Sequence, residues 1–121
     1  MWNYCLQNDG KEINKFFILF LFKMFVKIIK SYRDVVAICD KEILGKKFEE
    51  GNLQLDVKEN FYSGKECSEK EVIEIIQRMS EEDATFNIVG KKAVNAALKS
   101  GIIEEIGVKQ IQGVPFALVL I

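Results

Sequence analysis

Gly90, Lys91 and Lys92 form the segment of this sequence whose residue types are best suited to binding an anion. A helix is expected to begin here, and free backbone amides at a helix N-terminus, with two lysines beside them, favour phosphate or an RNA backbone. Asn87, just upstream, would either cap that helix or contact a base, and capping is the preferred interpretation. The competing interpretation of the segment is that both lysines are solvated surface residues.

A second candidate for recognition is the polar break around Tyr32 and Arg33, which is expected to form the tip of a β-hairpin. Tyrosine and arginine are enriched at recognition sites. In an RNA complex the ring would stack on a base and the guanidinium would bind phosphate. Lys46 and Lys47 would add to this basic surface. The competing interpretation is an ordinary polar turn.

Asp34, Asp40 and Glu42 are the carboxylates that could carry acid–base chemistry or hold a metal. The spacing of Asp40 and Glu42 does not place them side by side on a helix, because residues two apart face different directions. Asp40 is better suited to capping one helical turn, which Gly45 would end. We therefore assign no metal ligand and no catalytic residue.

The chain of 121 residues contains no histidine, which excludes Ser-His-Asp and Cys-His catalysis and any histidine general base. Its three cysteines form no C-x-x-C pair, so neither a structural zinc site nor a disulfide framework is expected. Cys39 and Cys67 are expected to be small core residues of a protein in a reducing compartment. No cofactor is expected.

Hydrophobic periodicity predicts two helices. Ser68 and Glu71 form a capping box, and Val72, Ile75, Ile76 and Met79 make one apolar stripe of the helix that follows. A compact alanine-rich helix follows Gly90 and ends at Gly101, which suits a left-handed residue. Strands are expected at residues 24–30, 35–40, 52–59, 85–89, 106–111 and 114–121, with residues 46–51 as a polar connector.

The expected fold is α+β: a mixed, mostly antiparallel sheet of about five strands with two helices on one face. Residues 116–121 are uniformly apolar, so this last stretch should be interior. Pro115 lacks an amide hydrogen and belongs at a strand start or on an edge. Val114, Pro115 and Phe116 are therefore the expected apolar edge for a protein partner.

Residues 1–23 differ in composition from the rest, and four of the nine phenylalanines lie within residues 16–22. We interpret residues 1–23 as a mis-annotated extension, with Met24 starting a single domain of residues 24–121. The alternative, a membrane anchor, needs about 20 apolar residues, whereas this run has seven. The net charge of −1 gives no general attraction to nucleic acid. No membrane association is expected.

Residues 24–121 resemble an archaeal family called domain of unknown function 424. The similarity is carried by DKEILGK at residues 40–46, FYSG at 61–64, NIVG at 87–90, Ala93-Val94, GII at 101–103 and GVP at 113–115. Family members often have a histidine after the Gly-Val-Pro, where this chain has Phe116. The resemblance implies an archaeal, cytoplasmic protein with no established activity, so no functional residue is transferred.

The sequence favours a small non-catalytic, cytoplasmic binding module associated with RNA or a ribonucleoprotein such as the translation machinery. A protein-interaction subunit of a larger complex is the alternative. A carboxylate-dependent enzyme is a third hypothesis, which the absence of histidine weakens.

Overall fold

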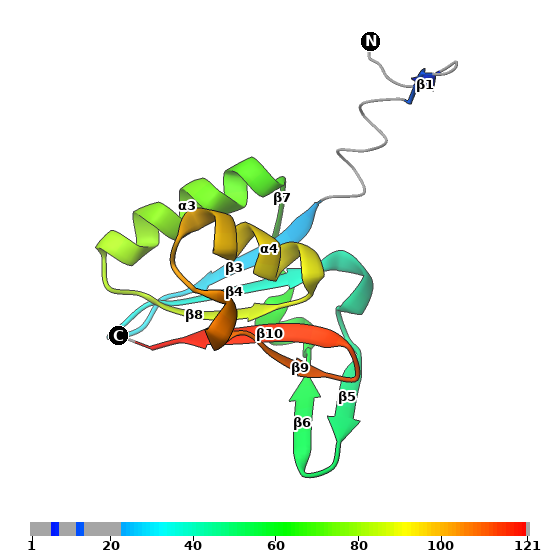
Figure 1. Cartoon of the computed structure of the whole chain (residues 1–121). Coiled ribbons are helices and arrows are strands. Elements are labelled where there is room, and N and C mark those ends of the chain that lie inside the picture. Colours follow the sequence, from blue (N-terminus) through cyan, green and yellow to red (C-terminus); the bar gives the residue numbers. More distant parts are fainter. Residues whose placement is uncertain (1–5, 8–11, 14–22, 121) are drawn as a thin grey trace.

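A six-stranded mixed sheet forms the centre of the computed structural model, which describes residues 6–7, 12–13 and 23–120. The strand order is β7-β3-β4-β8-β10-β9, in which only the β4–β8 pair is parallel (Figure 1). The sheet confirms the expected α+β fold. The bounds are β3 (Met24–Ile29), β4 (Val35–Asp40), β7 (Lys65–Cys67), β8 (Thr85–Val89), β9 (Lys109–Ile111) and β10 (Val114–Val119).

Two helices, α3 (Glu69–Glu81) and α4 (Lys91–Ser100), cover one face of this sheet, as the sequence predicted (Figure 1). The apolar stripe of α3 is buried against the sheet, since these side chains recur every three or four residues. Small alanines on α4 let its backbone approach the strands. The fully buried side chains of this core include Met24, Val36, Ile38, Val72, Ile76, Phe86 and Ile88.

Both helix boundaries marked by local sequence are confirmed. The Glu71 amide donates to Oγ of Ser68 (3.3 Å), and the Ser68 amide donates to Oε1 of Glu71 (2.9 Å), which completes the capping box of α3. Gly101 ends α4 with φ of 85°, the left-handed conformation that glycine adopts without a steric penalty.

The second face of the sheet carries a small layer that the sequence did not predict. β5 (Lys47–Glu50) pairs with β6 (Leu53–Asp56) as a hairpin, and α2 (Glu59–Tyr62) follows. Residues 46–51 were therefore wrongly interpreted as a connector. The hairpin and α2 lie under only one end of the sheet (Figure 1).

The chain passes from this second layer back to the sheet at Gly64. A Cβ at this position would lie 2.9 Å from Cα of Lys27 and closer still to the Val26 carbonyl, so only glycine permits this crossing. β7 then starts immediately, at Lys65, and pairs with β3 only as far as Val26. The outer side of β3 beyond Val26 consequently has no strand beside it among the described residues.

The remaining elements are short: β1 (Leu6–Gln7), which pairs with β2 (Glu12–Ile13), and two 3-10 turns, η1 (Lys41–Ile43) and η2 (Glu105–Gly107). The strand expected at residues 106–111 begins only at Lys109, because η2 occupies its first part. The interpretation of residues 1–23 falls mostly outside the described residues. In the described part of the chain, no helix has the length and apolar character to cross a membrane.

Candidate binding surfaces

Asp40, the last residue of β4, caps helix α4 and not the turn that follows it in sequence. It is 3% exposed, and its carboxylate accepts hydrogen bonds from the backbone amides of Lys92 (3.1 Å) and Ala93 (2.8 Å). The expected capping of η1 is wrong, because η1 has no side-chain cap. Burial raises the pKa of the Asp40 carboxyl, although the two amides oppose this shift.

The Asp40 carboxylate occupies the position where a phosphate would bind to α4. Gly90 is the N-cap residue, with φ of +110°, and this conformation brings the backbone close to Asp40. A Cβ on Gly90 would lie 2.6 Å from Oδ1 and 2.8 Å from Oδ2 of Asp40. The backbone amides that were expected to bind an external anion are therefore already bound to the carboxylate of Asp40.

The two lysines beside Gly90 also differ from the expectation of a joint anion site. Lys92 Nζ donates to Oε2 of Glu42 at 2.9 Å, whereas Lys91 is exposed. Burial alone would raise the pKa of Glu42, but its bonds with Lys92 lower it overall. Charge at this end of α4 is thus largely compensated within the protein.

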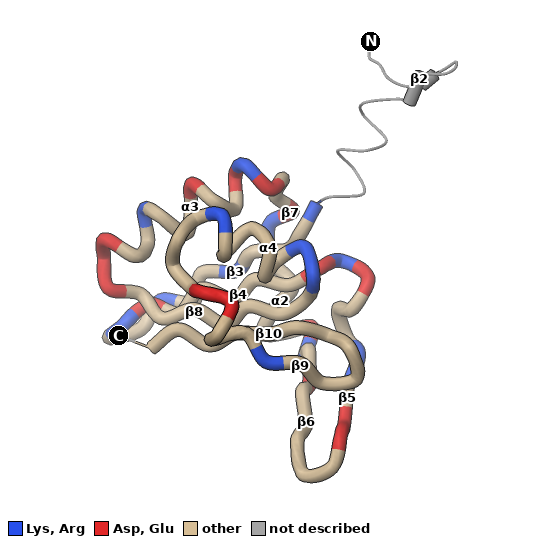
Figure 2. Tube along the Cα trace, viewed as in Figure 1, with Lys and Arg blue, Asp and Glu red and all other residues tan. Residues whose placement is uncertain are grey.

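Lys46 and Lys47, the other basic residues expected to contribute to this surface, lie at the β5–β6 hairpin. Lys47 Nζ lies 3.7 Å from the Glu49 carboxylate, and Lys46 is exposed next to this hairpin. Figure 2 shows acidic and basic positions distributed over the whole fold. A basic surface built from Arg33, Lys46, Lys47, Lys91 and Lys92 therefore stays a prediction.

Tyr32 and Arg33 lie at the tip of the β3–β4 hairpin, as predicted, and Tyr32 is completely exposed. Asp34, Glu82 and Asp83 line the same shallow hollow. Because phosphate is repelled by carboxylates, these acidic neighbours weaken the interpretation of this turn as a phosphate contact.

The three candidate carboxylates do not converge on one place. Asp34 precedes β4 and binds Lys30 (3.1 Å), whereas Asp40 ends the same strand, about 20 Å away at the rise of an extended chain. No cluster of metal-ligating side chains exists among residues 6–7, 12–13 and 23–120. Burial raises the pKa of the Cys39 thiol and of the Tyr62 hydroxyl to about 12, so neither group ionises readily.

The edge expected at Val114, Pro115 and Phe116 is not free. β9 pairs with all three residues, and Pro115 is buried. The outer edge of β10 is open only beyond Phe116, where the chain of the neighbouring strand turns away into η2. The prediction of an open edge rested on Pro115. This proline lies at the start of β10, on a stretch that β9 covers, and does not mark the open edge.

Strand register divides the second face of the sheet into rows. The row Phe25–Cys39–Val89–Phe116 is covered by α2 and the β5–β6 hairpin. The next row, Lys27–Ala37–Asn87–Leu118, is covered only in part, since Ala37 is buried in the same cluster, and the row Ile29–Val35–Thr85 contributes no residue to that cluster. We call these two rows, with Leu120, the open half-face.

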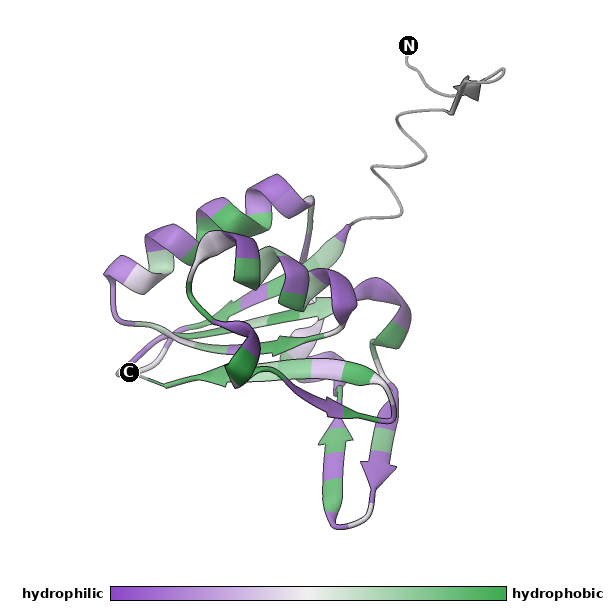
Figure 3. Ribbon diagram, viewed as in Figure 1, coloured by the Kyte–Doolittle hydropathy of each residue, from purple (hydrophilic) through white to green (hydrophobic). Residues whose placement is uncertain are grey.

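The leucine side chains of β10 and of the residue just after it are the most exposed part of the open half-face. Leu118 is 61% exposed and Leu120 is 73% exposed. The expectation that residues 116–121 are interior is therefore wrong, since alternate side chains of a strand point to opposite faces. Among residues 116–120, Ala117 and Val119 point toward the helices, and Figure 3 shows this part of β10 coloured as hydrophobic.

Asn87 lies in the middle of β8 and faces a groove of about 400 Å³ where the open half-face meets α2. It does not cap α4, so the preferred interpretation from sequence is wrong. Its side chain has no hydrogen-bonding partner within the described ranges. The groove, called the Asn87 groove below, is lined by Asp56, Lys58, Asn60, Phe61, Tyr62 and Asn87.

Comparisons with other proteins agree with this fold. The model of a family described as "Protein of unknown function (DUF424)" matches residues 29–121. The crystal structure of an uncharacterized conserved protein from Methanopyrus kandleri superposes with a TM-score of 0.71 and 23% identity, covering 80% of this chain and 90% of that one. At this identity the likeness establishes the fold alone. No curated protein matches the chain.

Proposed function

The chain belongs to the DUF424 family, and because that description names no activity, we propose from the geometry that it is a non-catalytic module that binds a partner polypeptide. The observation that carries this proposal is the open half-face. The layer made by α2 and the β5–β6 hairpin does not extend over all of it, and it presents Leu118 and Leu120 to solvent.

Leu118 and Leu120 are exposed on the same face at successive alternate positions, which separates them from singly exposed apolar residues. Scattered exposed hydrophobic side chains are normal, but a contiguous patch with a polar rim marks an interaction site. Leu118 is the direct neighbour of Asn87 across the sheet, and the next row holds Val35 and Ile29. Lys27, whose ammonium donates to the Asn60 carbonyl (2.6 Å), forms a polar rim.

The backbone beside these leucines offers a second mode of contact. The Gly90 amide donates to the Pro115 carbonyl (2.8 Å), so the backbone carbonyl of Pro115 points toward β8. Backbone groups of successive residues in a strand point to opposite edges, so the amide and carbonyl of Leu118 point to the outer edge of β10. β9 ends opposite Phe116, which leaves that edge open at Leu118. An extended segment of the partner can therefore add to β10 and cover the leucines together.

The matched pair of variants Leu118→Asp and Leu53→Asp tests this proposal. Leu53, on the β5–β6 hairpin, is 55% exposed against 61% for Leu118, so both changes put a charge at an exposed leucine. We expect the tagged full-length chain to copurify from its host with a protein that resists ribonuclease and high salt. Leu118→Asp should lose that protein, and Leu53→Asp should retain it. Equal retention by both folded variants would contradict the proposal.

RNA is the second candidate, and the Asn87 groove is the observation that favours it. Asn87, Asn60 and Lys58 offer hydrogen bonds to a base edge and a phosphate, and the half-buried Phe61 ring lies beside them. RNA or a ribonucleoprotein partner predicts binding that ribonuclease removes and that weakens steeply with salt. Asn87→Ala would then abolish binding, whereas Leu118→Asp would matter less.

We place this module in the cytoplasm. The support is the pair of buried free thiols of Cys39 and Cys67, which suits a reducing compartment. The same thiols have pKa values raised by burial, which agrees with a packing role and not with catalysis.

A further inference from the structure

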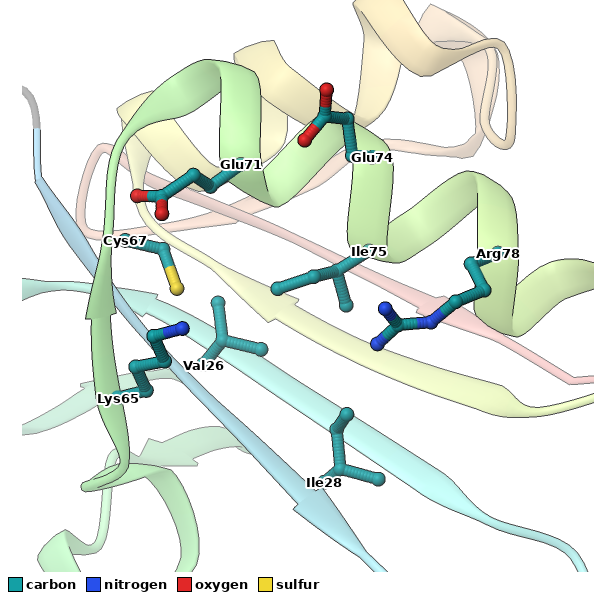
Figure 4. Close-up of a pocket in the computed structure, with 8 residues that line it drawn as sticks. All are labelled: Val26, Ile28, Lys65, Cys67, Glu71, Glu74, Ile75 and Arg78. Carbon is teal, nitrogen blue, oxygen red and sulfur yellow. The ribbon is translucent and has the colours of Figure 1, made fainter.

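A second cleft lies on the opposite side of the molecule, between the outer edge of β3, β7 and helix α3. Its volume is about 410 Å³ (Figure 4). It exists because β7 is only three residues long and pairs with β3 no further than Val26. The eight lining residues are Val26, Ile28, Lys65, Cys67, Glu71, Glu74, Ile75 and Arg78.

The floor of the cleft is apolar. Val26 and Cys67 are buried beneath it, and the half-buried Ile28 and Ile75 face each other across it in Figure 4. Any ligand chain that covers Ile28 and Ile75 removes apolar surface from water, which is favourable. Binding of an apolar chain therefore needs no rearrangement of the fold.

Two cations lie over this floor, one on each side of Ile75 (Figure 4). The Lys65 ammonium rises from β7, and the Arg78 guanidinium reaches in from the end of α3, each directed over the apolar side chains (Figure 4). Neither has a carboxylate partner among the described residues. The two are positioned to receive one anionic group above Ile75, where an arginine can bind a carboxylate with two parallel hydrogen bonds.

Neither glutamate of the cleft forms an ion pair with Lys65 or Arg78 among the described residues, but the pKa of Glu71 is lowered by the Ser68 amide and, to a smaller extent, by the charge of Lys65. Glu71 accepts the Ser68 amide hydrogen bond and belongs to the capping box, and its carboxylate lies over Cys67 at the closed end. Glu74 is exposed on α3, and its carboxylate is directed away from Ile28 (Figure 4). An anionic ligand would be repelled by these two carboxylates, so its charged group must lie toward Lys65 and Arg78.

We propose that this cleft binds a carboxylate with an apolar chain, the carboxylate between Lys65 and Arg78 and the chain over Ile28 and Ile75. The proposal does not depend on the open half-face, which lies on the other side of the sheet. A free acid and the C-terminus of a peptide share this chemistry.

Titration of the full-length chain with sodium octanoate, followed by isoleucine methyl resonances, tests the site. We expect saturable shifts at Ile28 and Ile75 with a dissociation constant on the order of 1 mM, and none at the exposed Ile106. Octanol, which has the same tail without charge, should bind more weakly. Arg78→Gln and Lys65→Gln should each weaken octanoate binding about fivefold, and the matched surface variant Lys91→Gln should not.

A second titration identifies the source of the carboxylate. It compares the binding of octanoate with that of the peptide acetyl-Ala-Ala-Leu, used both as the free acid and as the C-terminal amide. Tighter binding of the acid peptide than of octanoate would identify a peptide C-terminus, and the reverse would identify a free acid. The proposal is overturned if octanoate shifts neither methyl saturably, if octanol binds equally well, or if both charge variants bind octanoate like the unmodified chain.

Discussion

The two long helices of this protein begin in opposite ways. α3 is capped by its own neighbour: Ser68 and Glu71 exchange hydrogen bonds on the exposed surface. α4 is capped by Asp40, a buried residue far back in the chain, whose carboxylate serves the amides of Lys92 and Ala93. The first cap stabilises one helix, whereas the second also fixes that helix to the end of strand β4.

This difference decides what each helix end can do. A helix N-terminus with free amides is an anion site. In α4 the anion is a side chain of the protein itself, and Gly90 is the residue that lets it approach. Gly90 and Lys92, which suggest phosphate binding in the sequence, therefore serve the packing of α4. We expect partners to bind elsewhere, on the open half-face.

Gly90→Ala should have the largest effect on stability. The added Cβ would lie within 2.8 Å of Oδ2 of Asp40, and alanine is strained at φ of +110°. We expect a loss of about 4 kcal/mol in the free energy of unfolding, measured by denaturant titration, because the clash and the strain act together.

Gly101→Ala is the matched control for this change. Gly101 also has a positive φ, +85°, but an added Cβ would meet nothing within 4 Å. Gly101→Ala should lower the free energy of unfolding by only about 1 kcal/mol, because the positive φ strains alanine but no atom clashes with the added Cβ. Equal losses from the two variants would show that the approach of Asp40 to Gly90 is unimportant.

Asp40→Ala should have the second-largest effect, a loss of about 3 kcal/mol in the free energy of unfolding. It leaves the amides of Lys92 and Ala93 without their acceptor, and each unsatisfied buried donor costs about 1–3 kcal/mol. Asp56→Ala, at an exposed aspartate, is the control and should change little. In a double-mutant cycle Asp40→Ala should remove part of the cost of Gly90→Ala, since the two residues are in contact.

Sequence reasoning could find the first cap and not the second for a physical reason. Both partners of the capping box lie within one helical turn, so their geometry is fixed once the helix forms. Asp40 lies at the start of a short helical turn that it could have capped just as well. Only the parallel pairing of β4 with β8 brings Asp40 to α4, and one chain's pattern does not reveal such pairing.

The same limit explains what was missed on the second face. Residues 116–121 are all apolar, so nothing in their pattern separates the buried Ala117 from the exposed Leu118. Residues 46–51 are polar, yet they form β5 because their partner, β6, lies just beyond the turn at Gly51, where φ is +61°. The helices, the glycine stop and the α+β class were predictable because their signals are local.

Ser68→Ala should have a smaller effect, about 1 kcal/mol in the free energy of unfolding. The amide of Glu71 that loses its acceptor is on the surface, where water replaces the hydroxyl. Ser68→Asp keeps an acceptor and should restore most of the loss. A cost for Ser68→Ala as large as that of Asp40→Ala would break the distinction between an exposed and a buried cap.

The smallest expected effect is the pH dependence of the stability that each cap contributes. It distinguishes the two caps most clearly, because the two contributions change with pH in opposite directions. The hydrogen bond from the Ser68 amide lowers the pKa of Glu71, so its contribution is present above about pH 4.3 and is lost as pH falls through the lowered pKa. Burial raises the pKa of Asp40, so its contribution is present below about pH 3.9 and is lost as pH rises through the raised pKa.

Glu71→Gln and Asp40→Asn remove one titration each, and unfolding midpoints measured from roughly pH 3 to roughly pH 7, a range that includes the ordinary pKa values of both residue types, separate them. The advantage of the unmodified chain over Glu71→Gln should shrink as pH falls. Its advantage over Asp40→Asn should grow as pH falls, because a protonated Asp40 avoids burying a charge. Slopes of the same sign would mean that the amides of Lys92 and Ala93 outweigh burial at Asp40, and that both caps act as ionised acceptors.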